Sequence, residues 1–358
     1  MSSEILVFGG FLVLIVIILM IDLLWVGRNV HVVSTKEAMI WSVVWIGLAL
    51  CFYGFLHFYG HLLHGISTPE ELADITSKYA PGLRFKTTGF ESMLAEYRQY
   101  MSLSYLSGYF IEKTLSVDNI FVILLILRGF AVPLKDYKSV LFWGILGAII
   151  LRFIFIFAGS ALIQKFEWIL LVFGAFLVFQ GGKILFSKDK NEKDPHDYAI
   201  VRYLSRHFNI TKGYVNDRFM LRIDGKLFLT PLFVVLVLIE FTDLLFAMDS
   251  IPAVFSVSLD PFVVFFSNIY AIIGLRALFF LIANMVDKFR FLKIGVSILL
   301  VFVGLKLLLH GWLDEIGFTP AYSLYFIAFI LIMSIVLSVV IPPKIQVSEE
   351  EAGVHPEK

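Results

Sequence analysis

The sequence predicts an all-α polytopic membrane protein with about nine transmembrane helices, six of which form two inverted three-helix repeats. Of 358 residues, 59% are hydrophobic and only 16% are charged. The mean hydropathy is +0.87, far from the composition of soluble domains. Long apolar runs recur along the chain, and one set of polar residues occurs twice in the same order.

Apolar runs long enough to cross a bilayer, about 20 residues each, define the predicted spans. They cover approximately residues 5–26, 38–60, 103–127, 139–163, 167–186, 229–257, 262–286, 291–310 and 320–341. The first run follows a start that has neither a basic region nor a small-residue cleavage site. We therefore expect it to be a span and not a cleaved signal peptide.

Basic residues predict the orientation of these spans. Under the nine-span model one set of connections holds most of them, namely Arg28 and Lys36, Arg128, Lys135 and Lys138, the stretch from Lys188 to Lys226, Lys288, Arg290 and Lys293, and Lys344. The positive-inside rule makes that side cytoplasmic. The N-terminus is then outside and the C-terminus is cytoplasmic.

These spans divide the chain into seven parts. Two N-terminal transmembrane helices (1–60) precede an extracytoplasmic segment (61–102), the first three-helix repeat (103–186), a cytoplasmic loop (187–228), the second, inverted repeat (229–310), a last transmembrane helix (311–343) and a disordered cytoplasmic tail (344–358). Alternating apolar residues around Asp224-Gly225 predict a hairpin in the cytoplasmic loop.

Composition excludes several classes of function. The net charge is zero, so the chain lacks the basic surface that nucleic-acid binding requires. The one cysteine, Cys51, cannot form an internal disulfide or a thiolate metal site. Because no histidine or nucleophile is predicted at depth in the membrane, we expect no enzyme activity and no cofactor.

The internal repeat is the strongest feature of the sequence. The segment EKTLSVDNIFV (112–122) matches DLLFAMDSIPAV (243–254). Four pairs of residues correspond: Glu112 with Asp243, Asp118 with Asp249, Arg152 with Arg276, and Lys183 with Lys306. Each unit holds three spans, and three is odd, so the two units must cross the membrane in opposite directions. A polar site between two inverted repeats is a common architecture of secondary transporters.

Carboxylates within the apolar runs are the candidate ligands. These are Glu112, Asp118, Glu240, Asp243 and Asp249, and Asn119 adds an amide oxygen. An ionised carboxylate at the bilayer centre costs about 2.5–3.5 kcal/mol. Arg152 and Arg276 can neutralise two of the five, so the surplus must bind protons or a cation. Oxygen ligands favour hard ions such as Mg²⁺, Ca²⁺ or Mn²⁺, whereas the alternative is that the acids form structural ion pairs.

Helix geometry predicts a break beside these acids. Residues six positions apart on a continuous helix point about 120° apart. Pro252 frees the carbonyl of Met248, so we expect the sixth span to be broken where Asp249 lies, with a weaker break at Asp118-Asn119. A packed proline kink is the alternative. Met248 offers a soft ligand or, more simply, fills apolar space.

Other polar residues have two interpretations. Asp22 lies near Arg28 at the end of the first span and fits either a snorkelling surface pair or a position on the ion pathway. His57, His61 and His64 share a helix face with spacing that a metal could use. Interfacial histidines that face water are the simpler interpretation of these three.

These motifs resemble the TerC family, and especially its Alx-type members. The likeness lies in GYFIEKTLSVDNIFV, GAIILRFIFIFAGSALI, WILLVFGAFLVFQGGK, FTDLLFAMDSIPAVFSV, DPFVVFFSNIYAIIGLRALFF and VFVGLKLLL. The resemblance implies manganese export in a bacterial inner membrane, linked to alkaline or tellurite stress. It assigns the metal path to Glu112, Asp118, Asn119, Glu240, Asp243 and Asp249. Some members carry the label of redox modulator, which one cysteine fits poorly.

The combined prediction is a secondary transporter that exports a divalent cation, with protons as the coupling ion and manganese as the implied cargo. Charge balance or coupling falls to Arg152, Arg276, Lys183, Lys306 and Asp22. The alternative is a membrane-bound redox modulator or accessory stress-response protein whose acids are structural. An intramembrane metalloenzyme is a more distant third.

Overall fold

The computed structural model describes most of the chain. It covers residues 8–18, 35–166, 168–186, 199–211, 213–215, 218–223, 225–283, 291–315, 318 and 320–341. Asp22, Asp224 and the tail from residue 342 lie outside this part. The side chains of Asp118, Met248 and Asp249 also lie outside it, although their backbone is helical. Structural statements below refer to the described residues.

The N-terminal part is helical and extends beyond the apolar runs. A short helix covers Phe8–Ile18, and it is followed by α2 (Thr35–Tyr59), the 3-10 turn η1 (Gly60–Leu63), α3 (Pro69–Tyr79) and α4 (Phe90–Gly129). Thr68 and Glu71 form a reciprocal capping box at the start of α3. We call residues 60–100 the outer lobe; most of it lies within the predicted extracytoplasmic segment (61–102).

Helix α4 is longer than the predicted span at 103–127. It has 40 residues, about 60 Å at 1.5 Å per residue, so its first turns project out of any bilayer core. Buried Leu94, Tyr97, Met101 and Tyr105 recur at helical spacing and fix this extension. The charged residues between them hid the helix from a search for apolar runs.

The rest of the first half includes α5, α6 and the polar connection. The elements are η2 (Leu134–Asp136), α5 (Tyr137–Lys165), α6 (Trp168–Phe186), α7 (Ala199–His207), β1 (Met220–Ile223) and β2 (Lys226–Leu229). The two strands pair antiparallel, with Ile223 opposite Lys226. The predicted hairpin is present, and Gly225 has the positive φ of 76° that its turn requires.

The second half follows directly from β2. Its elements are α8 (Pro231–Phe255), α9 (Pro261–Ile273), α10 (Leu275–Ala283), α11 (Leu292–Leu308), α12 (His310–Glu315) and α13 (Pro320–Val340). Asp260 caps α9 by accepting a hydrogen bond from the Phe262 amide at 2.9 Å. Helices α9 and α10 meet at a bend of 43°.

Many helices have the length and apolarity of membrane spans. Within the described residues five helices can cross a bilayer, or six if the bent α9–α10 pair forms one span. Helix α4 is not among these five, while the helices at Phe8–Ile18 and Ile294–Leu308 are shorter apolar segments. The structure therefore supports an all-α multi-span membrane protein, and nine spans remain a prediction.

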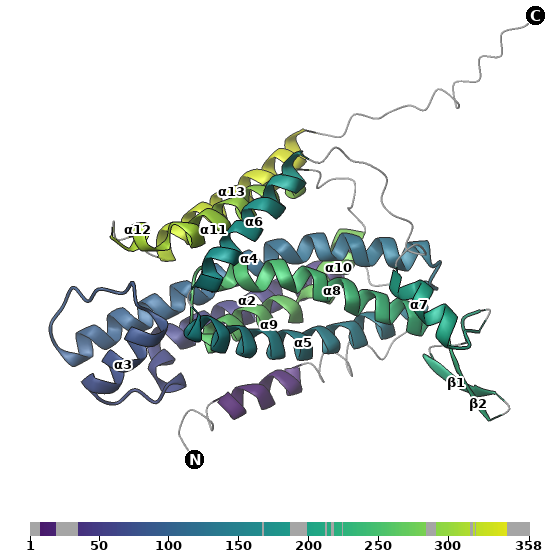
Figure 1. The fold of residues 1–358 in the computed structure, drawn as a ribbon, viewed down its shortest axis with the longest axis horizontal. Coiled ribbons are helices and arrows are strands. Elements are labelled where there is room, and N and C mark those ends of the chain that lie inside the picture. Colours follow the sequence, from purple (N-terminus) through teal and green to yellow (C-terminus); the bar gives the residue numbers. More distant parts are fainter. Residues whose placement is uncertain are drawn as a thin grey trace, which may run out of the picture.

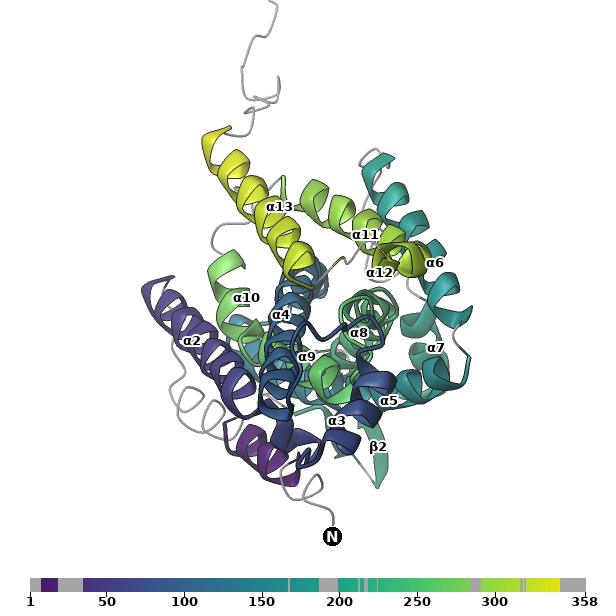
Figure 2. The same ribbon diagram turned by 90° about the vertical axis from the view of Figure 1, so that its left-hand side faces the viewer.

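The helices form a bundle and an adjoining group (Figures 1 and 2). Helices α2, α4, α5, α8 and α9 run alongside one another, and α6, α11 and α13 gather on one side of them. The outer lobe with α3 lies at one end of the bundle, and α7 with the β-hairpin lies at the other. The two long polar segments are thus at opposite ends, as the nine-span topology requires.

Helices α6 and α11, the third helices of the two proposed repeats, form the most extensive helix contact. Gly174 lies against the backbone of Gly304, and Gly181 lies against the backbone of Ser297. Position numbers rise along α6 as they fall along α11, so the two helices run antiparallel. Glycines at both contacts allow the backbones to approach closely.

The other two repeat-related pairs also contact each other in antiparallel directions. Gly108 in α4 lies against Val254 near the end of α8, and the Tyr214 hydroxyl, in the segment before α8, donates to the carbonyl of Phe130 just after α4. In the α5–α9 pair, Phe153 contacts Phe265 and Phe157 contacts Phe262. Opposite directions within all three pairs are what an inverted repeat requires, although the repeat itself remains a prediction.

The predicted helix breaks are wrong. Helix α8 continues without interruption from Pro231 to Phe255, so Pro252 lies in its last turn and frees a carbonyl without opening the helix. Helix α4 is also continuous through Asp118-Asn119. The bend occurs instead at Gly274, where α9 ends and α10 begins.

Candidate functional site

A buried arginine lies at the centre of the bundle, where four helices meet. Arg152 of α5 is 1% exposed. Its Nη1 donates to Glu112 Oε1 of α4 and to Asn268 Oδ1 of α9 at 2.6 Å. Two oxygens of α8 complete the surroundings, Ser250 Oγ at 3.4 Å from Nη1 and Asp243 Oδ1 at 3.4 Å from Nη2. We call these five residues the Arg152 cluster.

The cluster joins the two halves of the chain. Glu112 belongs to the first half and Asp243 to the second, and the repeat aligns them with each other. Both form ion pairs with the same guanidinium. Repeat-related acids that share one partner lie close to the interface between the halves, where an inverted repeat places its polar site.

Around the Arg152 cluster, oxygen atoms that can accept hydrogen bonds outnumber the groups that donate them. Glu112 Oε2 and Asp243 Oδ2 of the cluster, and Glu240 Oε2 on α8, are among the buried oxygens that have no hydrogen-bond partner in the described structure. An unpaired buried carboxylate oxygen is costly. One guanidinium faces two carboxylates here, so the five residues carry one surplus negative charge when both acids are ionised, and a proton or a cation can neutralise it.

Glu240 lies one helical turn before Asp243 on α8. Its carboxylate is seated against the backbone of Gly147 in α5, and a methyl group on that glycine would overlap it. Residues three apart on a helix are neighbours, so Glu240 extends the acidic region along α8. Gly147 is the position where α5 provides room for this side chain.

The structure also locates some of the other candidate residues predicted from the sequence. Asn119 and Arg276 are 4% and 7% exposed, respectively. Lys183 is exposed on α6, and Lys306 lines an outer pocket described below. The side chains of Asp118 and Asp249 and the whole of Asp22 lie outside the described part.

Two cluster members were missing from the predicted ligand set. Asn268 is fully buried in the apolar stretch PFVVFFSNIYAII of α9. Ser250 lies on α8 and is 1% exposed. A polar amide in an otherwise apolar span was the available signal for Asn268, since such residues face the bundle interior.

A lysine caps the bend between α9 and α10. Lys113 Nζ donates to the carbonyl of Ala271 at 3.2 Å, which lies in the last turn of α9. A Cβ on Gly274 would lie 2.8 Å from the same ammonium nitrogen. A cation at a helix C-terminus stabilises the carbonyls that have no partner within the helix. Lys113, the residue after Glu112, therefore stabilises the end of α9 at this bend.

The three histidines do not form a metal site. Among the described side chains no group of three or more His, Cys, Asp and Glu could hold a metal ion. His64 is buried and its Nε2 lies 2.7 Å from Asp260 Oδ2, so the expectation that all three histidines face water is wrong. Helix α2 ends at Tyr59 and η1 follows, which turns His64 away from the face that the helical spacing predicted.

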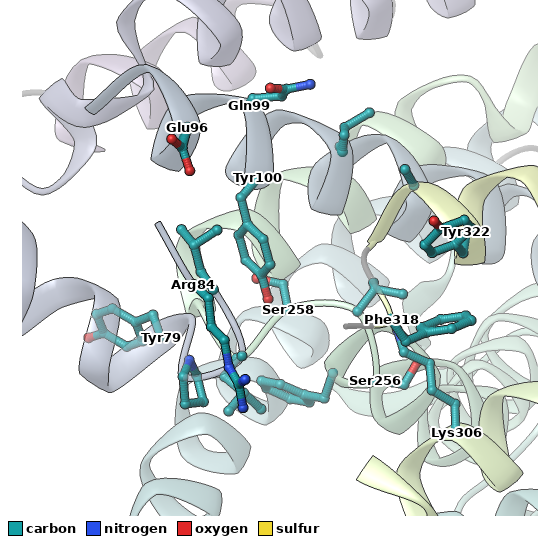
Figure 3. A pocket seen from close by; sticks show the side chains of 18 of the residues that line it. Tyr79, Arg84, Glu96, Gln99, Tyr100, Ser256, Ser258, Lys306, Phe318 and Tyr322 are labelled. Atoms are coloured by element: carbon teal, nitrogen blue, oxygen red, sulfur yellow. The ribbon is translucent and has the colours of Figure 1, made fainter. Parts of the chain in front are cut away.

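The outer end of α8 opens on a pocket of about 580 Å³. Figure 3 shows Arg84, Tyr100 and Lys306 among its lining side chains. Its acid, Glu96, already accepts hydrogen bonds from the Thr87 hydroxyl and amide and from the Lys86 amide. The basic lining of this pocket contrasts with the acidic Arg152 cluster.

Long apolar helices around a buried ion-pair cluster define a multi-pass integral membrane protein. The chain belongs to the TerC family: the model described as "Integral membrane protein TerC family" matches residues 97–345. The resemblance noted in the sequence is thereby confirmed.

Curated relatives support this assignment. The chain is 42% identical over 305 residues, 85% of each chain, to a protein of Salmonella typhi named "Putative membrane-bound redox modulator Alx". It is 40% identical over 334 residues to the protein of the same name in Escherichia coli (strain K12), covering 93% of this chain and 94% of that one. "Uncharacterized membrane protein STKORF319" of Myxococcus xanthus is 40% identical over 332 residues, 93% and 91% of the two chains. No solved structure matches the chain.

Proposed function

We propose that this protein is a secondary transporter that exports a divalent metal cation from the cytoplasm, with Mn²⁺ as the physiological ion and protons as the coupling ion. The observation that carries the proposal is the meeting of Glu112 and Asp243, repeat-related acids from the two halves, at one buried arginine. A structural ion pair needs one acid for one base. The surplus acid and the unpaired carboxylate oxygens fit a site that takes up positive charge.

The chemistry of the cluster favours a hard divalent ion. Carboxylate, amide and hydroxyl oxygens come from Glu112, Asp243, Asn268 and Ser250. Mg²⁺, Ca²⁺ and Mn²⁺ prefer such oxygens. The choice of Mn²⁺ among them comes from the family resemblance, and Asp118 and Asp249 are proposed as further ligands on the same path.

Alternating access would use the antiparallel helix pairs. In transporters with inverted repeats, one half rocks against the other around a fixed midplane site. Carboxylates that release the metal outside can take up protons there and return neutralised, which couples export to the proton gradient. Inner-membrane placement with a cytoplasmic C-terminus belongs to the same proposal.

The names of the relatives suggest a second function, redox modulation. Cys51 is the only cysteine and lies exposed on α2. One thiol cannot cycle between dithiol and disulfide within a chain. No feature of the Arg152 cluster favours electron transfer, so cation transport remains the proposal.

The test is Mn²⁺ uptake into inverted membrane vesicles with and without an imposed pH gradient. We expect uptake that depends on the gradient, and we expect Asp118→Asn and Asp249→Asn to abolish it while the protein still inserts. Asp74→Asn, at an exposed position on α3, is the matched control and should transport normally. Wild-type rates in both site variants would remove the midplane site from the mechanism.

A further inference from the structure

The oxygens around Arg152 converge as ligands do around a metal ion. Three of them, from Glu112, Asn268 and Ser250, lie within hydrogen-bond reach of the single nitrogen Nη1. A guanidinium Nη carries two N–H donors, so this nitrogen faces more oxygens than it can serve. Convergence of several oxygens on one point is the geometry that divalent cations require.

The charges of the cluster support the same view. Arg152 brings one positive charge to the two carboxylates of Glu112 and Asp243. A divalent cation at this point would neutralise both. Glu112 Oε2 and Asp243 Oδ2, which have no partner in the described structure, would then add ligand oxygens that the guanidinium leaves unused.

All hydrogen bonds of the Arg152 side chain come from the two Nη atoms at its tip. Arg152 is the longest side chain of the cluster, and the oxygens lie on shorter side chains of α4, α8 and α9. Its own Nε has no hydrogen-bond partner in the described structure, so hydrogen bonds hold the guanidinium only through its two Nη atoms. A third acid, Glu240, lies on α8 one turn before Asp243, and its Oε2 has no hydrogen-bond partner in the described structure.

We propose that Arg152 is a tethered cation that occupies the oxygen cage of Glu112, Asp243, Ser250 and Asn268 in the ion-free conformation and is displaced by the transported divalent ion. This inference rests on the proposed function. It assigns Asn268 and Ser250 as ligands outside the acidic motifs. It also makes Arg152 a competitor for the cage oxygens, which promotes release of the transported ion.

Mn²⁺ binding to the purified protein in lipid nanodiscs, followed by loss of the electron paramagnetic resonance signal of free Mn²⁺, tests the proposal. Removal of a competitor that fills the cage for nine-tenths of the time tightens apparent binding about tenfold. We therefore expect Arg152→Gln to bind Mn²⁺ about tenfold more tightly than wild type. Unchanged or weaker binding overturns the inference.

Lys113→Gln is the control for general electrostatics. It removes one positive charge beside Glu112, but its ammonium bonds the Ala271 carbonyl and not the cage. The gain in Arg152→Gln must exceed the gain in Lys113→Gln, and equal gains overturn the competition. Binding by wild type but no gain in Arg152→Gln refutes this inference alone, whereas absence of binding in both proteins refutes the proposed function.

The ligand role of Asn268 has its own matched pair. In the Arg152→Gln background, Asn268→Ala should loosen Mn²⁺ binding because one cage oxygen is lost. Ser267→Ala should not, since that hydroxyl bonds the Val264 carbonyl. Equal effects of the two changes overturn the assignment of Asn268.

A chemical competitor keeps the proposal testable if Arg152→Gln fails to fold. Arg152→Ala leaves a space for added ethylguanidinium, which should stabilise this variant during purification. We expect ethylguanidinium to compete with Mn²⁺ in Arg152→Ala and to leave Mn²⁺ binding by wild type unchanged. Mn²⁺ binding by Arg152→Ala that is insensitive to ethylguanidinium contradicts shared occupancy of the cage.

Discussion

Two adjacent glycines on α6 provide a sharp test of the helix packing between the two halves. A Cβ on Gly181 would lie 2.7 Å from the Ser297 carbonyl oxygen and 2.9 Å from the Val301 amide nitrogen. Both atoms are backbone, so only separation of α6 from α11 can relieve the overlap. A Cβ on Gly182 would meet nothing within 4 Å.

We expect Gly181→Ala to destabilise the protein by about 1–3 kcal/mol, the usual cost of overpacking a tight contact. Gly182→Ala should be neutral or stabilising by up to about 1 kcal/mol, because alanine restricts the unfolded chain and favours helix. Thermal unfolding of both variants in the same detergent compares them directly with wild type. Equal losses in the two variants would refute the close α6–α11 contact.

Three further predictions concern the ends of the bundle. Hydrogen bonds from Thr87 hold the pKa of Glu96 below its ordinary value of 4.5, so the contact stabilises the outer lobe above that value and is lost as pH falls through the lowered pKa. Protection factors of amides in residues 84–89, which are corrected for the intrinsic pH dependence of exchange, should therefore fall on acidification in wild type but stay constant in Glu96→Gln, and parallel profiles would contradict this. Asp260→Ala should lose both the α9 cap and the His64 contact, about 2–4 kcal/mol together, whereas Asp260→Asn should retain the cap and lose less; equal unfolding temperatures would exclude the two-part role. A C-terminal tag and a labelled residue within 65–100 should report opposite sides of the membrane, and labelling on one side would exclude the nine-span topology.

The apolar runs predicted most of the helices because a helix in contact with lipid needs a nearly continuous run of apolar residues. Such a run ends where the helix leaves the membrane. The first turns of α4 carry Glu91, Glu96 and Arg98 among their buried apolar positions, so no apolar run marks them. Only the spacing of Leu94 and Tyr97 indicated a helix before residue 103.

The bend between α9 and α10 could not be predicted from local sequence. Proline is the usual marker of a broken helix, and Pro252 drew the prediction to α8. At Gly274 the freed carbonyls are served by Lys113 from α4, a helix distant in sequence. Because a tertiary contact stabilises this bend, the only feature of the local sequence that marks it is Gly274.

The candidate site was partly predictable for a similar reason. Charges in apolar segments stand out, so Glu112, Asp243 and Arg152 were identified as interacting groups, and the structure brings them together. Neutral polar residues such as Asn268 and Ser250 are common in membrane helices. Their part in the cluster depends on which helix faces which, and this follows from the packing of α4, α5, α8 and α9.

The two halves also differ in ways that the repeat does not predict. Glu240 precedes Asp243 by three positions, whereas Tyr109 precedes Glu112 by the same spacing. The residue after Glu112 is Lys113, but the residue after Asp243 is Leu244. The first half thus adds a cation near the site and the second half adds an acid.

This asymmetry bears on the energy of the proposed transport cycle. In a transporter with identical inverted halves, the inward-facing and outward-facing states would be related by a two-fold axis in the membrane plane and equal in intrinsic energy. A fixed cation on one half and an additional acid on the other make the two states unequal. Moving one charge across the membrane potential changes the energy by about 2.3 kcal/mol per 100 mV, so opposite charges on the two halves would respond to the potential in opposite senses. In the transport cycle that we propose, Lys113 and Glu240 would therefore make the two states unequal in energy.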